Sequence, residues 1–269
     1  MEIVSPIAFV LSLPLARAFA APRTPLEYLA TVVEGFNSLP VARKCLVGFF
    51  VGHYANRAVV STWQNPSRAR MNILVPLSAI VFNIMNGSTM GTWVGAGPSS
   101  SRSGLEPGRL GLFLVGSLMW FIGFSSNIYH DHVLYALKRD KLAQTASRKK
   151  KQAGNDPKDR YSIPRAGLYR YMSHPSYSCE WFEWLGFLIC ALSLSHTTPF
   201  PVASKIVSPH WMPLVPLAGW YLQPPALFLW QEIALMLPRA RAGHRWYEKT
   251  FGEQWHREGA KWVVLPGLY

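Results

Sequence analysis

Residues 110–128 read LGLFLVGSLMWFIGFSSNI and contain no charged side chain over nineteen positions. A helix needs about 20 predominantly apolar residues to cross the hydrocarbon core of a bilayer. We therefore predict that residues 110–128 form a helix that spans a membrane.

Similar apolar stretches lie on both sides of this segment. They cover residues 45–63, 71–94, 181–194 and 211–237, and residues 7–21 form a further stretch of marginal length. The prolines in residues 211–237 predict a kinked or split helix there; they are Pro213, Pro216, Pro224 and Pro225. We predict an all-α, polytopic membrane helix bundle of about six visible spans, forming a single domain over residues 1–269.

The composition excludes two other classes of protein. Hydrophobic residues make up 49% of the chain and charged residues 15%, whereas a soluble domain carries about 25% charged residues. A chain with 14 Phe, 11 Trp and 11 Tyr is too aromatic to be disordered. The three cysteines form no CxxC pair, which excludes a disulfide scaffold or a zinc ribbon.

A basic segment follows the segment 110–128. Residues 138–160 contain nine Lys or Arg and three Asp, a net charge of 9 − 3 = +6 within a chain of net charge +13. The positive-inside rule predicts a cytosolic loop here. A nucleic-acid-binding arm also explains the charge but leaves the apolar spans unexplained.

Polar side chains inside apolar spans are candidate site residues because they are costly to insert into a bilayer. Tyr54 lies between His53 and Arg57, which share a helix face. Asn127 and Asp131 are also four residues apart. The nearby His130-x-His132 pair does not predict a metal site, because alternate residues on a helix point to different sides.

Two further clusters lie towards the C-terminus. His174-Pro175 predicts the start of a helix with proline at its first position, and Glu180 and Glu183 then share one face. The last cluster is basic and aromatic, and contains Arg239, Arg241 and HRWY at 244–247. This pattern is typical either of an interfacial anchor or of a phosphate-binding site with rings for stacking.

The order of these motifs resembles the steroid 5α-reductase (3-oxo-5α-steroid 4-dehydrogenase) family. The resemblance runs from residue 45 to the C-terminus and is strongest over residues 161–269. It rests on HYANR at 53–57, Asn86-Gly87, NIYHD at 127–131, YSIPRAGLYRYMSHPSYSCEWFEWLGF at 161–187, HRWYEKTFGEQW at 244–255 and the terminal VVLPGLY.

The resemblance implies a seven-helix membrane reductase that uses NADPH to reduce a C=C bond conjugated to a ketone. The implied catalytic pair is Tyr54 with Glu2, which lies in the similar segment MEIVSP. If Glu2 is that residue, we expect the chain to lack most of the first helix. The implied cofactor-binding residues are Asn65, Arg68, Asn127, Asp131, Tyr161, Ser176, Glu180, Glu183, Arg239, His244 and Tyr247.

Two positions depart from the family pattern. Ser176 stands where an Asn is usual, so a hydroxyl replaces an amide that would contact the nicotinamide. Lys138 replaces a usual Arg and keeps the charge without the guanidinium fork. The resemblance further implies a steroid or sterol-like enone as substrate, contact with membrane lipids, no obligate protein partner and an endoplasmic reticulum location.

Other activities share parts of this pattern. A trans-2-enoyl-CoA or polyprenol-type reductase presents the same enone geometry. An isoprenylcysteine-type methyltransferase that uses S-adenosylmethionine shares the HPSY block at 174–177, but it leaves Tyr54, Asn127 and Asp131 without a role. A lipid-binding membrane protein with decayed sites is the non-catalytic alternative. No GxGxxG motif is present, so a dinucleotide would be held by the membrane helices themselves.

Overall fold

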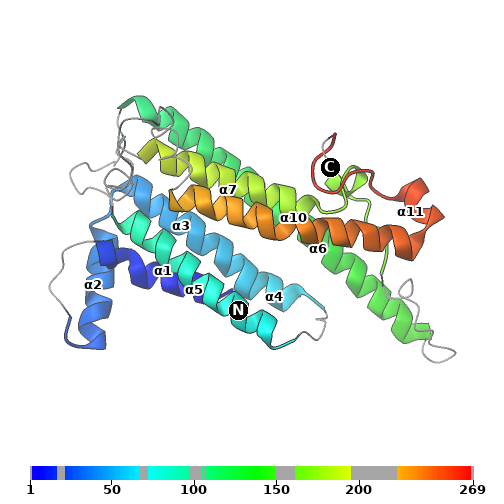
Figure 1. Ribbon diagram of the computed structural model, residues 1–269, viewed down its shortest axis with the longest axis horizontal. Helices are drawn as coiled ribbons and strands as arrows, with labels where there is room; N and C mark the ends of the chain where they lie inside the picture. The colour runs from blue at the N-terminus through cyan, green and yellow to red at the C-terminus, as the bar shows by residue number, and fades with distance from the viewer. Residues whose placement is uncertain are drawn as a thin grey trace, which may run out of the picture. The chain divides into compact units, whose positions relative to one another are not determined.

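The computed structural model describes residues 2–16, 22–66, 72–96, 105, 107–148, 161–194 and 223–267. Apart from one isolated bridge between Met172 and Trp262, regular structure in these ranges is helical, which confirms the all-α prediction. The elements (Figure 1) are α1 (Val4–Ser12), η1 (Leu13–Ala16), α2 (Pro25–Asn37), α3 (Val41–Ala55), the π-helix η2 (Asn56–Val60), α4 (Ser61–Gln64), α5 (Leu74–Gly95), η3 (Pro107–Arg109), α6 (Leu110–Arg148), η5 (Gly167–Arg170), α7 (Pro175–Leu194), α10 (Pro224–Phe251) and α11 (Glu253–Glu258).

The chain divides into two compact units. Unit 1 comprises Met1–Thr62, Ala69–Trp120 and Leu185–Trp230, and unit 2 comprises Trp63–Arg68, Phe121–Trp184 and Gln231–Tyr269. Helices α6, α7 and α10 each contribute residues to both units.

In unit 1, α1 packs against α5 with the two backbones in close approach, side by side in Figure 1. Gly87, Gly91 and Gly95 recur every four residues along one face of α5. A Cβ atom on each would collide with a backbone carbonyl oxygen of α1 or of the adjoining η1. Those carbonyls belong to Ser5, Phe9 and Leu13, which share the same spacing. Small residues at intervals of four allow membrane helices to approach closely.

Helix α3 completes this layer through aromatic side chains and one buried arginine. Phe50 stacks on Phe9 of α1 with ring centroids 4.2 Å apart. Arg43 is 7% exposed, and its Nη1 donates to the carbonyl oxygens of Trp93 at 3.0 Å and Val94 at 2.8 Å. These carbonyls lie in the last turn of α5, where helix acceptors lack partners in their own helix, so Arg43 fixes α3 to the end of α5.

Helices α6 and α7 also meet through glycines. In unit 1, a Cβ on Gly116 would lie 2.7 Å from the Gly186 carbonyl oxygen. In unit 2, a Cβ on Gly123 would lie 2.5 Å from the Glu183 backbone nitrogen and 2.8 Å from the Cys179 carbonyl oxygen. This contact brings the next turn of α6, which carries Asn127, opposite the glutamates of α7.

The C-terminal segment of unit 2 pairs with the residues that precede α7. The Trp262 amide donates to the Tyr171 carbonyl at 3.0 Å, and the amides of Ser173 and His174 donate to Trp262 and Val263 at 2.9 and 3.0 Å. A small core beneath this pairing consists of Ile163, Phe251, Trp255 and Ala260, with Trp246 and Tyr247 packed against it.

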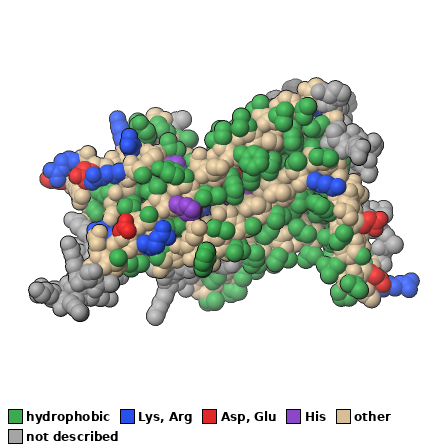
Figure 2. Space-filling model, turned by 180° about the vertical axis from the view of Figure 1, so that it is seen from behind, with side chains coloured by type: hydrophobic (Ala, Val, Ile, Leu, Met, Phe, Trp, Pro, Cys, Tyr) green, Lys and Arg blue, Asp and Glu red, His purple; other side chains and the backbone are tan. Residues whose placement is uncertain are grey.

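Two described helical segments are long and apolar enough to cross a membrane, namely Leu74–Gly95 and Leu110–Gln144. Leu77, Val81 and Leu118 are more than half exposed on them. Figure 2 shows hydrophobic side chains over much of the visible face. The other predicted spans fall on shorter or more polar helices in the described ranges, and residues 211–222 lie outside those ranges.

Two boundaries differ from the sequence-based prediction. The loop expected from Lys138 is helical up to Arg148, because residues 138–148 are good helix formers and contain neither Gly nor Pro. Residues 149–160 of the predicted loop, together with Pro213 and Pro216, lie outside the described residues. Pro224 does not break a helix but begins α10, and Pro238 lies inside it.

We predict that Gly91→Ala lowers the stability of the protein by about 1–3 kcal/mol, because the added methyl group overlaps the Phe9 backbone. The matched control is Gly48→Ala in α3, where a Cβ meets no atom within 4 Å. Helix propensity there favours alanine by up to about 1 kcal/mol. Thermal unfolding of both purified variants in detergent measures the difference, and equal midpoints would contradict the close contact.

Candidate functional site

The residues expected to bind the cofactor and the expected catalytic pair fall in different units. Tyr54 and Glu2 belong to unit 1, and Arg68 lies outside the described residues. The remaining cofactor candidates belong to unit 2: Asn65, Asn127, Asp131, Tyr161, Ser176, Glu180, Glu183, Arg239, His244 and Tyr247.

A buried amide–carboxylate pair joins α6 to α7. Asn127 Nδ2 donates to Glu180 Oε2 at 3.1 Å, and the two residues are 3% and 4% exposed. Because a carboxylate accepts, this bond fixes the direction of the amide and turns Asn127 Oδ1 away from Glu180. Oδ1 is buried and has no hydrogen-bond partner among the described residues. A buried acceptor of this kind is suited to a ligand N–H group.

Polar residues continue along both helices from this pair. Asp131 follows one turn later on α6 and is partly buried. On α7, Ser176 is 7% exposed beside the Tyr169 phenol, and Glu183 is fully buried one turn beyond the first glutamate. The predicted shared face of the two α7 glutamates agrees with the burial of both side chains.

His130, by contrast, holds the segment before α7 in place. Its Nδ1 lies 2.7 Å from the Ser126 carbonyl oxygen, and its Nε2 accepts the Leu168 amide at 3.1 Å. Gly167 approaches the same ring with a φ of 60°, a conformation that suits glycine. Both ring nitrogens of His130 therefore serve the backbone.

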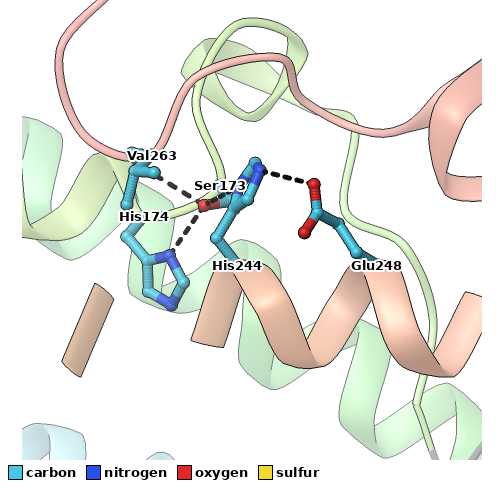
Figure 3. Close-up of polar contacts among 5 residues, drawn as sticks. All are labelled: Ser173, His174, His244, Glu248 and Val263. Carbon is cyan, nitrogen blue, oxygen red and sulfur yellow. Dashed lines mark hydrogen bonds and ion pairs between the residues drawn. The ribbon is translucent and has the colours of Figure 1, made fainter. Parts of the chain in front are cut away.

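A second cluster surrounds the hydroxyl of Ser173 (Figure 3). Ser173 Oγ lies 2.8 Å from His174 Nδ1 and 3.0 Å from His244 Nδ1, and 3.3 Å from the Val263 carbonyl oxygen. On the other side of the imidazole, His244 Nε2 lies 3.5 Å from Glu248 Oε1. The sequence singled out His244 but not Ser173 or Glu248.

Burial favours the neutral forms of these histidines. It lowers the pKa of His174 to about 4, with a smaller contribution from neighbouring His244. Burial also lowers the pKa of His244, although the Glu248 carboxylate acts in the opposite direction. Such shifts occur when the charged form loses hydration.

A chain of aromatic side chains continues from this cluster, beginning with Trp255 against the His244 ring. Tyr247 stacks on Trp255 with ring centroids 4.8 Å apart and planes at 11°, and burial raises its pKa to about 12. Tyr161 is 46% exposed and meets Trp246 edge-on at 5.0 Å. Arg239 is exposed on α10. Tyr247 is thus packed among other rings, whereas Tyr161 offers open surface.

Asn65 connects the segment after α4 to the polar extension of α6. Lys138 Nζ donates to Asn65 Oδ1 at 3.0 Å, and Arg139 Nη1 donates to the Gln64 carbonyl oxygen at 3.4 Å. The helical continuation of α6 past Lys138 is what places these donors next to residues 64 and 65.

In unit 1, Tyr54 is 6% exposed and lies between the rings of Phe50 and His53, at 4.8 and 5.1 Å. The π-helix η2 begins at Asn56, directly after α3, and single π-helical turns are frequent at functional sites. Glu2 Oε2 lies 3.7 Å from the Nε of Arg57 in this π-helix.

An open apolar groove of about 380 Å³ runs along α1 and the face of α3 and η2. Its lining includes Ile3, the neighbour of Glu2, and Ala55, the neighbour of Tyr54. The full lining is Ile3, Pro6, Ile7, Val10, Leu11, Val51, Ala55 and Val59. A groove with this lining is suited to a hydrophobic molecule.

Comparisons with known proteins bear on this arrangement. The profile of a family described as 3-oxo-5-alpha-steroid 4-dehydrogenase matches residues 69–202. An uncharacterized protein of Schizosaccharomyces pombe is 34% identical over 259 residues, which cover 93% of this chain and 77% of that protein.

Two relatives that are named for an enzymatic activity are also similar. Steroid 5-alpha-reductase DET2 of Solanum lycopersicum is 27% identical over 264 residues, covering 96% of this chain and 82% of the relative. 3-Oxo-5-alpha-steroid 4-dehydrogenase 1 of Bos taurus is 27% identical over 206 residues, covering 77% of this chain and 62% of the relative. The profile match contains Asn127, Ser176 and Glu180.

We predict that acid destabilises the protein through His174. Because the folded pKa of about 4 is below the ordinary 6.5, the unfolded chain binds more protons between these values. This contribution is fully present above pH 6.5 and is lost as the pH falls towards 4, at a cost of up to about 3 kcal/mol.

The measurement is unfolding in detergent as a function of pH. His174→Gln should flatten the plot of unfolding free energy against pH between pH 6.5 and 4. The matched control is His256→Gln on the exposed face of α11, which should leave the plot unchanged. A curve of unchanged slope in His174→Gln would show that another group carries the acid sensitivity.

Proposed function

Because this chain belongs to the 3-oxo-5α-steroid 4-dehydrogenase (steroid 5α-reductase) family, we propose that it reduces a carbon–carbon double bond conjugated to a ketone, using NADPH. Family membership makes it a membrane oxidoreductase that acts on a CH–CH group. The substrate we propose is a steroid or a related lipid, and the location a multi-pass one in the endoplasmic reticulum.

The observation that carries the cofactor proposal is the orphaned acceptor Asn127 Oδ1. The primary amide of a nicotinamide carries two N–H groups, and this oxygen and the Glu180 carboxylate would accept them. The Ser176 hydroxyl, one turn away from Glu180 on α7, can donate to the amide oxygen. The residues present therefore fit the nicotinamide end of the cofactor.

The phosphates of the cofactor call for donors and positive charge, which Arg239 and His244 of unit 2 can supply. We propose that Arg239 and His244 contact cofactor phosphates, with Arg68 and Asn65 contributing from the segment after α4. Arginine binds phosphate through two parallel hydrogen bonds. Tyr161, with an open ring face, is proposed to stack on the flat adenine ring, and Asp131, Glu183 and Tyr247 to support the site.

Bound NADPH supplies the hydride, which goes to the β-carbon of the enone. The task of the chain is to stabilise the negative charge that develops on the ketone oxygen. We propose that the Tyr54 hydroxyl donates a hydrogen bond to this oxygen, with Glu2 as the second member of the pair and Arg57 holding the Glu2 carboxylate. A proton then adds to the α-carbon, which gives the saturated ketone.

The groove beside these residues supports a hydrophobic substrate. Its side chains are apolar, and it borders the residues that follow Glu2 and Tyr54 in sequence. A substrate with a flat apolar body and one ketone would bury the body there and present its oxygen to a single donor.

We predict that Tyr54→Phe lowers kcat by about 100- to 1000-fold, the effect of removing one donor to a developing oxyanion. The affinity for NADPH remains within about twofold, because the phenol contacts the substrate and not the cofactor. The measurement is steady-state reduction of a 4-ene-3-oxo steroid by purified protein in nanodiscs. Unchanged turnover in Tyr54→Phe would remove this residue from the mechanism.

The same assay separates the proposed activity from its alternatives. A product formed from an enoyl thioester or a polyprenol-type substrate, but not from the steroid, would narrow the reductase to those substrates. A methylated product formed from S-adenosylmethionine would overturn the proposal.

We predict that Asn127→Ala weakens NADPH binding about tenfold, because one hydrogen bond is lost and Glu180 loses its donor. Energy transfer from tryptophan to bound NADPH measures the Kd. The matched control is Asn83→Ala: Asn83 is also buried, but its Nδ2 bonds within its own helix to Ala79. Equal affinities in the two variants would contradict the placement of the nicotinamide.

A further inference from the structure

The hydroxyl of Ser173 is the meeting point of three chain segments. The residue is 3% exposed, and its Oγ faces His174 Nδ1 of its own segment, His244 Nδ1 of α10 and the Val263 carbonyl of the C-terminal segment. Figure 3 shows both imidazoles turned towards this one oxygen. A serine hydroxyl has one proton and two lone pairs. The direction of the serine proton therefore decides which neighbouring histidine nitrogen acts as donor and which as acceptor.

Glu248 determines that His244 carries a proton on Nε2, the ring nitrogen that points away from Ser173. Its Oε1 lies 3.5 Å from His244 Nε2, and a carboxylate requires a proton on the nitrogen that it faces. A neutral His244 therefore carries its proton on Nε2 and presents Nδ1 as an acceptor. The Ser173 hydroxyl can then donate to Nδ1 at 3.0 Å.

The other ring must then take the opposite tautomer. With the serine proton directed to His244, the oxygen of Ser173 accepts a hydrogen bond from His174, so His174 carries its proton on Nδ1. The far edge of the His174 ring lies against Gly243 of α10, where a Cβ atom would overlap Nε2. This close approach covers one edge of the His174 ring and disfavours a second charge there.

We infer that Ser173 is a positioning residue that holds the His244 ring in one orientation in both of its protonation states. When His244 is neutral, the serine proton points to Nδ1. When His244 gains a proton on Nδ1, that nitrogen becomes a donor to Ser173 Oγ, and the serine proton turns to the Val263 carbonyl oxygen at 3.3 Å. No ring flip is needed, and Ser173 Oγ and both nitrogens of His244 keep their partners.

The groups around His244 allow this change of charge. Glu248 faces it from the same helix and favours the cation, whereas His174 faces it across Ser173 and stays neutral. The third neighbour is the ring of Trp255 from α11, edge-on at 5.4 Å, which does not titrate.

A consequence for the cofactor rests on the proposed function. If His244 contacts a cofactor phosphate, the anion raises the pKa of His244 in the complex above its value in the free protein. Binding between these two pKa values takes up a proton, so NADPH affinity falls as the pH rises through that window, by at most about tenfold per pH unit for one proton.

The first test needs no cofactor. Nuclear magnetic resonance of the full chain in detergent, with ¹⁵N-labelled histidine, reports which ring nitrogen carries the proton. The neutral form should show His244 protonated on Nε2 and His174 on Nδ1, with each signal assigned by its loss in His244→Gln and His174→Gln. A neutral His244 protonated on Nδ1 would overturn the inference.

The second test measures NADPH affinity against pH in matched serine variants. Ser173→Ala should weaken binding about fivefold, as expected for one lost hydrogen bond, and should shift the pH dependence. Ser173→Thr, which keeps the hydroxyl, should restore both. Ser178→Ala is the control, because Ser178 donates to the adjacent Val264 carbonyl oxygen but contacts neither histidine.

The outcomes separate the two proposals. Equal effects of Ser173→Ala and Ser178→Ala on affinity and on pH dependence would show that Ser173 only anchors the C-terminal segment, and would overturn the inference. If the unsubstituted protein fails to bind NADPH, both the proposed function and the proposed link between NADPH binding and the protonation of His244 are contradicted. The orientation of His244 is then decided by the tautomer measurement alone.

Discussion

The arrangement of the candidate cofactor site depends on how closely α6 and α7 approach each other. Gly123 has no side chain, and the backbone of α7 occupies the space where its Cβ would lie. One turn later, Asn127 therefore reaches Glu180 with a short polar side chain. A larger residue at position 123 would separate the helices and leave a buried carboxylate without its donor, which costs more than the hydrogen bond is worth.

Both units contain buried polar groups that connect their helices. In unit 1, Arg43 completes the end of α5, and the glycines of α5 let carbonyl groups of α1 approach. These contacts stabilise a helix layer beside an apolar groove. In unit 2, the buried groups include an acceptor left open at Asn127 and a shared hydroxyl at Ser173. A buried acceptor without a partner is costly in a folded protein, so the open oxygen of Asn127 is a candidate for a ligand contact. The hydroxyl of Ser173, by contrast, is used by protein groups.

The sequence predicted the elements that follow from local patterns. The apolar run at 110–128 lies in α6, the proline at 175 begins α7 as expected, and both glutamates on its predicted face are buried. Boundaries that depend on weaker preferences were wrong. The basic run after Lys138 was assigned to a loop on its charge, yet its residues favour a helix and α6 continues through them.

Contacts between distant residues could not be predicted in this way. The partners of Ser173 lie 71 and 90 residues away in sequence, and neither spacing nor composition indicates that they meet. The sequence also gives no sign of the π-helix after Tyr54, because its residues are equally compatible with an ordinary α-helix. The family resemblance named His244 as a site residue, but only the structure shows which atoms hold its ring.

Under the proposed function, Asn127 and Ser173 would hold a charged, elongated cofactor in two different ways. The amide of Asn127 is fixed by Glu180, so its free oxygen presents one acceptor in one direction and suits a group whose orientation sets the face of hydride transfer. The hydroxyl of Ser173 can rotate, so it keeps His244 in place whichever charge the ring carries. A rigid acceptor is needed where geometry controls the reaction, and a rotatable hydroxyl where the protein meets an anion whose charge varies with pH. Asn127 joins α6 to α7, and Ser173 joins the segment before α7 to α10. In the proposed site, separate side chains of unit 2 would therefore control the orientation and the charge.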